Sequence, residues 1–446
     1  MVRYLLRPKN LQKGIFKMTE CEILNYITEY GIKAKKASSV LATASIGAKN
    51  AALANAAELL VQKTDYIISE NAKDLEAAAN NGMSVPMQDR LRLTPQRIKD
   101  MAEGLTQLIS LEDPIGAIIE GYRRPNGLEI IKKRVPLGVI GIIYEARPNV
   151  TADAAGLCIK SGNACILRGG KEALRSNLAV ASVFGEALEK AGLPGDCVQL
   201  LDNTDREIAT AMMKLNKYID VLIPRGGAGL IRSVVNNASV PVIQTGTGNC
   251  HIYVDNEADI EMAYSVVMNA KTQRPSVCNA AETLLVNSEI ADAFLPVMAK
   301  KLAEKNVELR CCDAAYEILK KTGVVETANV VNATEEDWDT EYDDLILAIK
   351  VVPDYVAATA HVNAHGTGHS EAIITKNFDK ARYFQDNVDA ACVYVNASTR
   401  FTDGFEFGFG AEIGISNQKL HTRGPMGLKE LTTIKYVING NGQVRG

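Results

Sequence analysis

Apolar residues recur at helical spacing through the first quarter of the chain. Ala52, Ala56, Leu59 and Leu60 would share one side of a helix, in a background rich in Ala, Leu, Lys and Glu. This period of about 3.6 residues is typical of amphipathic helices. Residues 20–112 are therefore predicted to be helical, with a break at 84–86.

The pattern changes to extended segments near residue 115. Two apolar runs, 115–119 and 130–131, flank Pro125-Asn126-Gly127, and Asn-Gly is a strong turn signal. This predicts a β-hairpin. A further extended run, 432–438, is predicted to pair with this hairpin or with another subunit.

Short apolar runs then alternate with helical segments. The first group lies at 137–143, 164–167, 198–201 and 221–223, and the second at 252–254, 283–286 and 346–352. Strands that are apolar on both faces are typical of parallel sheets covered by helices. The predicted fold class is α/β in two units, the second running from near Cys250 to roughly residue 380.

Length and charge narrow the classes of function. A chain of 446 residues exceeds one hydrophobic core, so two or three domains are expected. The net charge of −4 gives no basic excess, so a nucleic-acid partner is not expected. The longest apolar runs are too short to cross a bilayer, so no membrane role is expected.

Cysteine and histidine usage point to a reducing compartment and away from a metal. The nine cysteines form no C-x-x-C pair, which is typical of free thiols, and a cytoplasmic location is expected. His361, His365 and His369 are evenly spaced, but glycines interrupt any helix there, so no metal site is predicted. Residues 1–17 are basic and read as an upstream extension with Met18 as the true start, or else as a targeting peptide.

Cys278 is the leading candidate for chemistry. It lies in a loop-like stretch that carries Lys271 and Arg274 but no acid, between a helical run and a strand-like run. Nearby cations and loop N–H groups favour the thiolate, which nucleophilic catalysis requires. The alternative is a small buried hydrophobic residue, which a lone cysteine often is.

Two glycine-rich turns follow strands of the first unit. Arg168-Gly-Gly-Lys171 and Arg225-Gly226-Gly227 each lead into a helix, whose first N–H groups can bind anions. Together they favour a nucleotide site, although tight turns that simply need glycine remain the alternative.

Two further segments are candidates for a place in the site. Asn149 follows a buried strand and could steady an oxyanion, or it holds the turn beside Pro148. Residues 245–249 are predicted to be a flexible linker before the second unit.

These motifs together resemble the γ-glutamyl phosphate reductase family, also called glutamate-5-semialdehyde dehydrogenases, within the aldehyde dehydrogenase superfamily. The similarity covers the chain from about Met18 to its end. The segments that carry it are Pro136–Thr151, Ile166–Ala173, Pro224–Gly227, Gln244–His251, Gly366–Ala372 and the stretch around Cys278.

The resemblance implies a fold and its domains. It implies a Rossmann-type cofactor domain (18–114 and 137–247, with a late segment near 383–416) and an α/β catalytic domain (248–382). A β-flap for oligomerisation is implied at 115–136 and 417–446.

The resemblance also implies site residues. Cys278 is the nucleophile, and Asn149 lies nearest to the superfamily's oxyanion asparagine. Arg168 and Lys171 lie beside the adenosine ribose, and Arg225, Gly226 and Gly227 match the pyrophosphate loop. Glu341 is similar in position to the glutamate that touches the nicotinamide ribose. Lys271 and Arg274 are predicted to hold the substrate phosphate, or else belong to a solvated loop.

The implied reaction is reduction of L-γ-glutamyl phosphate by NADPH through a Cys278 thioester, a step of proline biosynthesis. A hydrolytic NAD(P)-dependent aldehyde dehydrogenase is one rival, and a suitably placed glutamate base would favour it. In hydrolytic members a Glu-Leu-Gly-Gly stretch supplies that base, whereas this chain reads Gln244-Thr245-Gly246-Thr247. A non-catalytic NADP-binding protein is the second rival. The expected partners are a small-molecule substrate, further copies of the chain and, as one candidate, the upstream glutamate 5-kinase.

Overall fold

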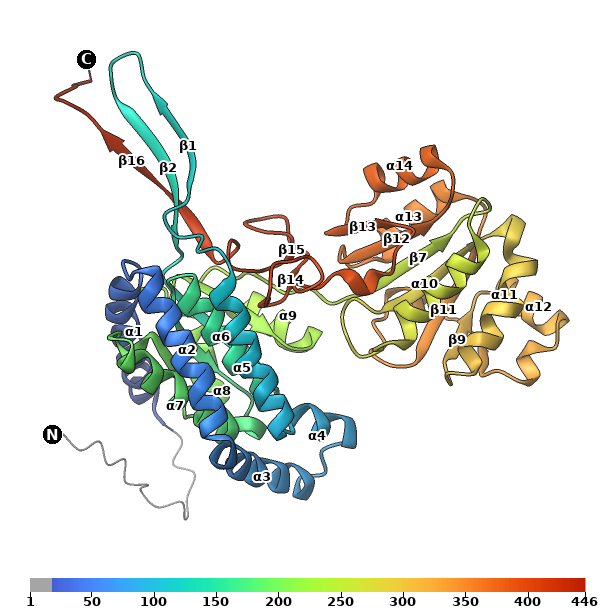
Figure 1. Ribbon diagram of the computed structural model, residues 1–446. Helices are drawn as coiled ribbons and strands as arrows, with labels where there is room; N and C mark the ends of the chain where they lie inside the picture. Colours follow the sequence, from blue (N-terminus) through green and yellow to red (C-terminus); the bar gives the residue numbers. More distant parts are fainter. Residues whose placement is uncertain (1–17, 446) are drawn as a thin grey trace.

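The computed structural model describes residues 18–445, so the predicted extension 1–17 lies outside the described residues. Two α/β domains stand side by side and a three-stranded flap projects from the first (Figure 1). The predicted helical region is confirmed as five helices. They are α1 (Glu20–Leu41), α2 (Ile46–Gln62), α3 (Thr64–Asn80), α4 (Val85–Leu91) and α5 (Pro95–Ser110).

The first domain is built on a four-stranded parallel sheet of order β5-β4-β3-β6. Its strands are β3 (Val139–Tyr144), β4 (Ala164–Arg168), β5 (Val198–Leu200) and β6 (Val221–Arg225). The chain runs from β3 outward to β4 and β5, and then returns to β6 on the other side of β3. The strand order therefore reverses between β3 and β6, which is where parallel sheets usually bind ligands.

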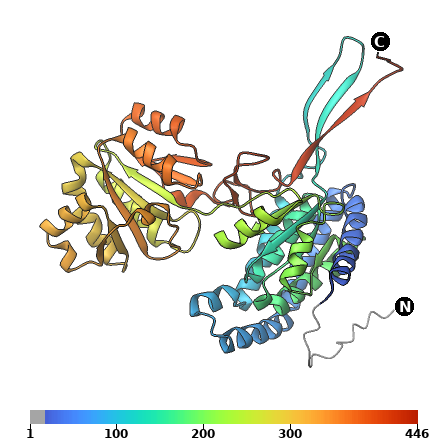
Figure 2. The same ribbon diagram turned by 180° about the vertical axis from the view of Figure 1, so that it is seen from behind.

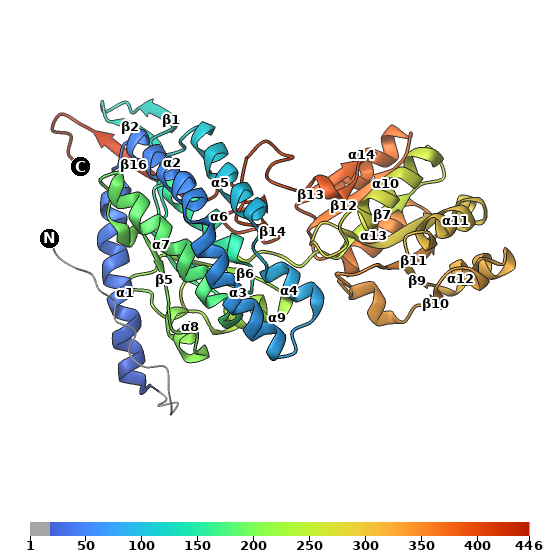
Figure 3. The same ribbon diagram turned by 60° about the horizontal axis from the view of Figure 1, so that its bottom comes forward.

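Helices cover both faces of this sheet because alternate strand residues point to opposite sides. Ile140 and Ile142 pack into a core with α2, α5, α6 (Pro148–Lys160) and α7 (Leu174–Lys190). Val139 and Ile143 pack on the other side against α1, α8 (Arg206–Met212) and α9 (Ala228–Asn237). Figure 3 shows α1 separated from the layer that holds α2 and α5.

The second domain holds a seven-stranded sheet of order β10-β9-β11-β8-β7-β12-β13, all of it parallel. Its strands are β7 (Cys250–Val254), β8 (Ala281–Asn287), β9 (Glu308–Cys311), β10 (Val330–Asn332), β11 (Ile346–Val352), β12 (Ser370–Ile374) and β13 (Cys392–Val395). Its helices are α10 (Ile260–Thr272), α11 (Ser288–Ala303), α12 (Asp313–Lys321), α13 (Tyr355–His365) and α14 (Phe378–Asn387). Among residues 18–445, no helix is both long and apolar enough to span a membrane.

The end of the second domain differs from the predicted boundary at residue 382. β13 pairs with β12, and Phe384 of α14 lies in the core beneath them. The first part of the segment predicted to return to the cofactor domain, 383–416, therefore belongs to the catalytic sheet. The sequence pattern hid this because β13 is short and half-buried at the sheet edge.

The β-flap consists of β1 (Ile118–Arg123), β2 (Glu129–Pro136) and β16 (Thr432–Asn439). The hairpin is confirmed, and β16 pairs antiparallel with β2 along its full length. The flap points away from both domains in Figures 1 and 2. It carries exposed apolar side chains, which are Ile118, Ile119, Tyr122, Ile434, Tyr436 and Ile438. Residues 417–428 of the predicted flap lie outside this sheet and contain β15 (Gly424–Pro425), which pairs with β14 (Ile415–Ser416) just before them.

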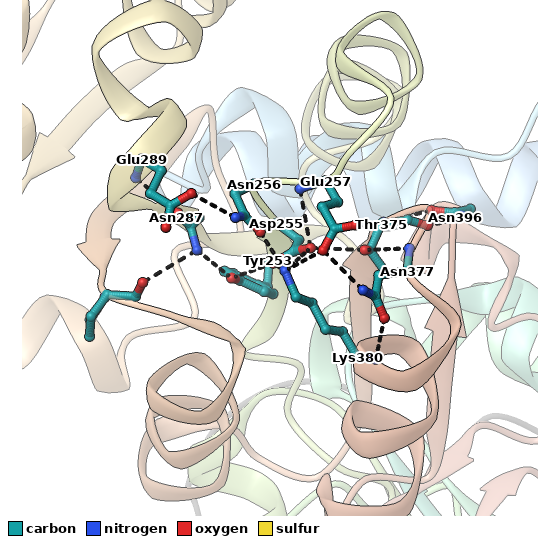
Figure 4. A network of polar contacts seen from close by, with 11 residues as sticks. Tyr253, Asp255, Asn256, Glu257, Asn287, Glu289, Thr375, Asn377, Lys380 and Asn396 are labelled. Atoms are coloured by element: carbon teal, nitrogen blue, oxygen red, sulfur yellow. Dashed lines mark hydrogen bonds and ion pairs between the residues drawn. The ribbon is translucent and has the colours of Figure 1, made fainter.

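A network of hydrogen bonds and ion pairs connects the carboxyl ends of β7, β8 and β12 (Figure 4). The fully buried Asp255 accepts hydrogen bonds from Tyr253 Oη at 3.0 Å and Thr375 Oγ1 at 2.9 Å. Lys380 of α14 donates to the same carboxylate at 3.0 Å and also pairs with Glu257. The two Asp255 oxygens thus join two neighbouring strands and a helix, which stabilises the sheet at this edge.

Replacing Asp255 with Ala should lower the free energy of unfolding by roughly 3–5 kcal/mol, because it removes one partner of a buried ion pair. Urea denaturation measures the change. The control is Asp386→Ala, which breaks an exposed pair with Arg382 and should cost less than about 1 kcal/mol. Equal losses for the two variants would contradict this role for Asp255.

Candidate active site

The nucleophile loop, residues 273–280, connects α10 to β8 and carries Cys278. Gly248, just ahead of β7, packs directly on it. A Cβ atom at Gly248 would lie 1.5 Å from the Cys278 carbonyl oxygen and 2.7 Å from its Cα. Only glycine allows this approach, so the backbone of Gly248 sets the position of the nucleophile.

The segment predicted to be a flexible linker, 245–249, is packed and hydrogen-bonded. Thr245 Oγ1 donates to the Pro224 carbonyl at 2.8 Å. Asn249 is fully buried, and its amide donates to the carbonyls of Trp338 and His365 at 2.7 and 3.0 Å. The crossing between the domains is therefore part of the site's framework.

Asn279 ties the nucleophile loop to the segment that follows β13. Its side-chain Nδ2 donates to the Thr402 carbonyl at 2.9 Å, and its own carbonyl accepts from Thr399 Oγ1 at 2.7 Å. Arg400, within η5 (Thr399–Phe401), donates Nη1 to Asn279 Oδ1 and Nε to Gln273 Oε1, the latter at 2.8 Å. Residues on both sides of Cys278 therefore hold Arg400.

The thiol of Cys278 is protonated in this environment, contrary to the prediction of a thiolate. Burial raises its pKa to about 12, and the carboxylates of Glu412, Glu341 and Asp343 push in the same direction. Arg225 is the cation that lowers the pKa, and it does not outweigh the burial. The sequence indicated the nearby cations but gave no sign of the acids, which come from distant segments.

Two of these acids are poised to exchange protons near neutral pH. Glu341 Oε1 accepts from the Gly248 N–H at 2.7 Å, so its carboxyl lies against the segment ahead of β7 that packs on Cys278. Glu412 is largely buried, and its Oε2 has no hydrogen-bond partner. Burial raises the pKa of each carboxyl to about 7. Either group can therefore accept or return a proton under working conditions.

Lys271 does not face this site, which removes the support for its predicted contact with phosphate. The side chain is fully buried, and its ammonium forms an ion pair with Glu282 at 2.5 Å. Burial raises the pKa of Glu282 to about 8 and lowers that of Lys271. The helical position of Lys271 in α10 turns it inward, whereas Arg274 in the loop is exposed.

Arginines from both domains act on Cys278 or on one another, and Arg225 and Arg400 are the two that interact electrostatically with Cys278. Arg274 lies near enough to Arg147 and to Arg400 to lower the pKa of each, after the larger effect of burial. Arg225 also acts on Arg147 and on Cys278. Like charges repel one another, so the cluster is suited to a ligand with several negative charges.

The turn after β6 is shaped for an anion. Gly227 N donates to Glu145 Oε2 at 3.1 Å, at the start of α9. A Cβ atom at Gly226 would lie 2.6 Å from the Glu145 carboxyl carbon. A carboxylate thus occupies the N–H groups that a pyrophosphate would use. The guanidinium of Arg225 instead packs over Gly414, toward Cys278.

The turn after β4 presents cations at the same edge of the sheet. Arg168 Nη2 donates to the Thr204 carbonyl at 2.5 Å, and its buried Nε has no partner. Arg206 lies near it, as do the carboxylates of Glu172 and Asp205. Lys171 is exposed. The unpaired Nε and the neighbouring cations fit a phosphorylated ribose.

Asn149 lies in the first turn of α6 and is exposed. Its amide donates to Asp153 at 3.2 Å, one turn along the helix. The pKa of Asp153 is raised to about 6 by burial. An oxyanion role for Asn149 stays a prediction, because its amide is engaged within its own helix.

The sequence interpretation missed Glu412 and Arg400. Both belong to the segment 396–416, which has little regular structure. The one available signal was its density of Gly and Phe after a strand, which marks a functional loop but identifies no role.

Replacing Glu412 with Gln should speed alkylation of Cys278 by iodoacetamide on the order of 3- to 10-fold at pH 8, because the change removes a negative charge that raises the thiol pKa. At about pH 5.5 Glu412 is neutral in the wild type, so the difference should vanish. Mass mapping of the Cys278 peptide measures the rate. Glu406→Gln, in the same segment but exposed, is the control, and an equal rate for both variants would refute the effect.

Comparisons with known proteins identify the family of the chain. A model of the aldehyde dehydrogenase family matches residues 26–316. The γ-glutamyl phosphate reductase of Clostridium perfringens (strain SM101) is 59% identical over 416 residues, which cover 93% of this chain and 98% of that protein.

Solved structures match over nearly the whole chain. The crystal structure of γ-glutamyl phosphate reductase from Thermotoga maritima is 48% identical, with a TM-score of 0.90, covering 94% of this chain and 100% of that one. An acetylating aldehyde dehydrogenase from Geobacillus thermoglucosidasius, 18% identical, has a TM-score of 0.68 over 96% and 99% of the two chains, and shows the fold alone. The chain belongs to the aldehyde dehydrogenase family and, within it, to the γ-glutamyl phosphate reductases.

Proposed function

We propose that this chain reduces L-γ-glutamyl 5-phosphate to L-glutamate 5-semialdehyde and releases phosphate, with NADPH as reductant. The observation that carries the proposal is a cysteine held by Gly248, with Arg225 of the first domain and Arg400 of the second near enough to interact with it electrostatically. Relatives that cover 93–95% of the chain at up to 59% identity bear the name of this activity. Such a site suits an acyl donor with several negative charges.

The residues of the chain account for each chemical step. Glu341 or Glu412 takes the proton of Cys278, whose sulfur then attacks the acyl carbon. The C–O bond to phosphate breaks, phosphate leaves, and a thioester remains on Cys278. When bound, NADPH would supply a hydride to the thioester carbon. The C–S bond then breaks, the aldehyde leaves, and the Cys278 sulfur recovers its proton.

A hydrolytic aldehyde dehydrogenase is the second candidate, and one observation favours it. The Gln244–Thr247 stretch lacks a carboxylate, but Glu341 and Glu412 lie near Cys278 with pKa values of about 7. A carboxylate able to accept a proton from an attacking water molecule is therefore present near Cys278. The full-length similarity to phosphate-releasing reductases supports our choice over this rival.

For the cofactor, we propose NADP(H) rather than NAD(H). Arg168 and Lys171 place two cations in the turn after β4, and Arg206 adds a third. A 2′-phosphate on the ribose would be attracted to these three cations, which outnumber the two carboxylates beside Arg168 (Glu172 and Asp205). Gly226 and Gly227 would receive the pyrophosphate once Glu145 withdraws.

We also propose that the β-flap binds a second copy of the chain, since its exposed apolar strands need a cover. Light scattering on a variant with Ile434 and Ile438 replaced by Ser tests this, and an unchanged mass would count against it.

All nine cysteines lie within the described residues and none forms a disulfide, which supports a reducing, cytoplasmic location. The upstream glutamate 5-kinase stays a predicted partner.

In the oxidative direction, NADPH formation from glutamate 5-semialdehyde and NADP should depend on added phosphate. Phosphate is then the group that releases the acyl chain from Cys278, and absorbance at 340 nm follows the reaction. Cys278→Ala should lose activity on the order of 10³-fold or more, whereas Cys158→Ala, a buried thiol, should keep it. Sustained turnover without phosphate, with glutamate as product, would replace our proposal with the hydrolytic one.

Replacing Arg168 and Lys171 together with Ala should weaken binding of NADP(H) more than binding of NAD(H), by on the order of tenfold or more. The reason is that only NADP(H) carries the extra phosphate. Fluorescence titration gives both dissociation constants, with Lys214→Ala, an exposed lysine of the same domain, as control. Equal weakening of the two cofactors would rule out this basis for selectivity.

A further inference from the structure

Arg400 has unused binding capacity beside the nucleophile. Its Nε and one N–H of Nη1 are bonded to Gln273 and Asn279. A guanidinium has five N–H donors in a rigid plane, so the remaining donors have a fixed direction. No carboxylate within residues 18–445 forms an ion pair with Arg400 or with Arg274.

The two bonds to Gln273 and Asn279 place this guanidinium close to the reacting atoms. Gln273 begins the nucleophile loop and Asn279 directly follows Cys278. The backbone carbonyls of Arg400 and Thr402 in turn accept from Asn279 Nδ2, so the contact is reciprocal. Movement of Arg400 relative to Cys278 would break several hydrogen bonds at once.

Arg274 provides a second positive charge at the same place. It is exposed in the loop, and its proximity lowers the pKa of Arg400, after the larger effect of burial. The charged or titratable groups that act on Arg400 are Arg274, Cys278, Asp403 and Cys250. Arg274 directly follows Gln273, which binds Arg400, and two nearby guanidinium groups without an ion-paired acid favour binding of a dianion.

We infer that Arg400, together with Arg274, binds the phosphoryl group of the acyl phosphate and stabilises it as it leaves. The inference rests on the proposed function and names the residues that recognise the leaving group. When the Cys278 sulfur bonds to the acyl carbon, the C–O bond to phosphate breaks and the electron pair stays on a phosphate oxygen. Fixed N–H donors at that oxygen stabilise the developing charge.

The phosphoryl group fits this place better than the α-carboxylate, the other anionic part of the substrate. The phosphoryl group is joined through one bridging oxygen to the carbon that Cys278 attacks, and attack begins at about 3–3.5 Å. The α-carboxylate is separated from that carbon by three further carbons of the substrate. Arg400 is tied to the residue next to Cys278, so the nearer group is the one within its reach.

Steady-state kinetics in the oxidative direction separate the two anions. With glutamate 5-semialdehyde and NADP, Arg400→Gln should raise the KM for inorganic phosphate at least about 10-fold and change the KM for the semialdehyde less than about threefold. Arg274→Gln should act in the same direction. Arg382→Gln, an exposed arginine of α14, is the matched control and should leave both constants unchanged.

Arg400→Lys keeps the charge, which guards against failure of Arg400→Gln to fold. It loses the planar fork, so it should still raise the KM for phosphate severalfold. An unchanged KM for phosphate in the folded Arg400 variants would overturn the inference, as would an equal rise in the KM for the semialdehyde. If the wild-type enzyme turns over without phosphate, the proposed function is wrong. That result is distinguishable from a failure of the inference about Arg400, in which the wild type needs phosphate but the Arg400 variants keep its KM.

Discussion

The contact between Gly248 and Cys278 is the constraint on which the site depends. The chain leaves the cofactor domain through residues 245–249 and enters β7 directly beneath the nucleophile loop. A backbone approach this close leaves no room for a side chain at position 248. The same glycine donates its N–H to Glu341, so one residue fixes the positions of both Cys278 and the Glu341 carboxyl group.

From that contact the charges of the site are arranged by three separate segments. The nucleophile loop supplies Cys278 and Arg274, the segment after β13 supplies Arg400 and Glu412, and the cofactor domain supplies Arg225. Burial and carboxylates raise the pKa of the Cys278 thiol. We propose that the arginines attract an anionic substrate and that the acid groups serve as proton acceptors rather than as ligands of the anion.

Local patterns in the sequence were sufficient to predict most helices and strands, but not every pairing between strands. The Asn126-Gly127 turn and the apolar runs at 137–143 and 164–167 predict the hairpin and the buried strands, because a strong turn signal and a continuous apolar run are both visible within a few residues. β13 was missed as part of the second domain's sheet because its four residues, CVYV, are too few to show which of the two sheets they join.

Long-range electrostatics were the part that the sequence could not supply. Cys278 is recognisable from its motif, yet its pKa depends on Glu341 and Glu412, which lie 63 and 134 positions away in sequence. Lys271 looked like a phosphate ligand because its loop holds no acid, but Glu282 reaches it from β8. A helix face and a strand face meet there, and no local window contains both.

The most direct measurement of the central claim is the mass of the enzyme after reaction without phosphate. Wild-type protein mixed with glutamate 5-semialdehyde and NADP should release one NADPH per active site and then stop. Peptide mapping of the quenched protein should find one γ-glutamyl group, as a thioester, on Cys278. An unmodified Cys278 after that burst, or acylation of another residue, would contradict the account.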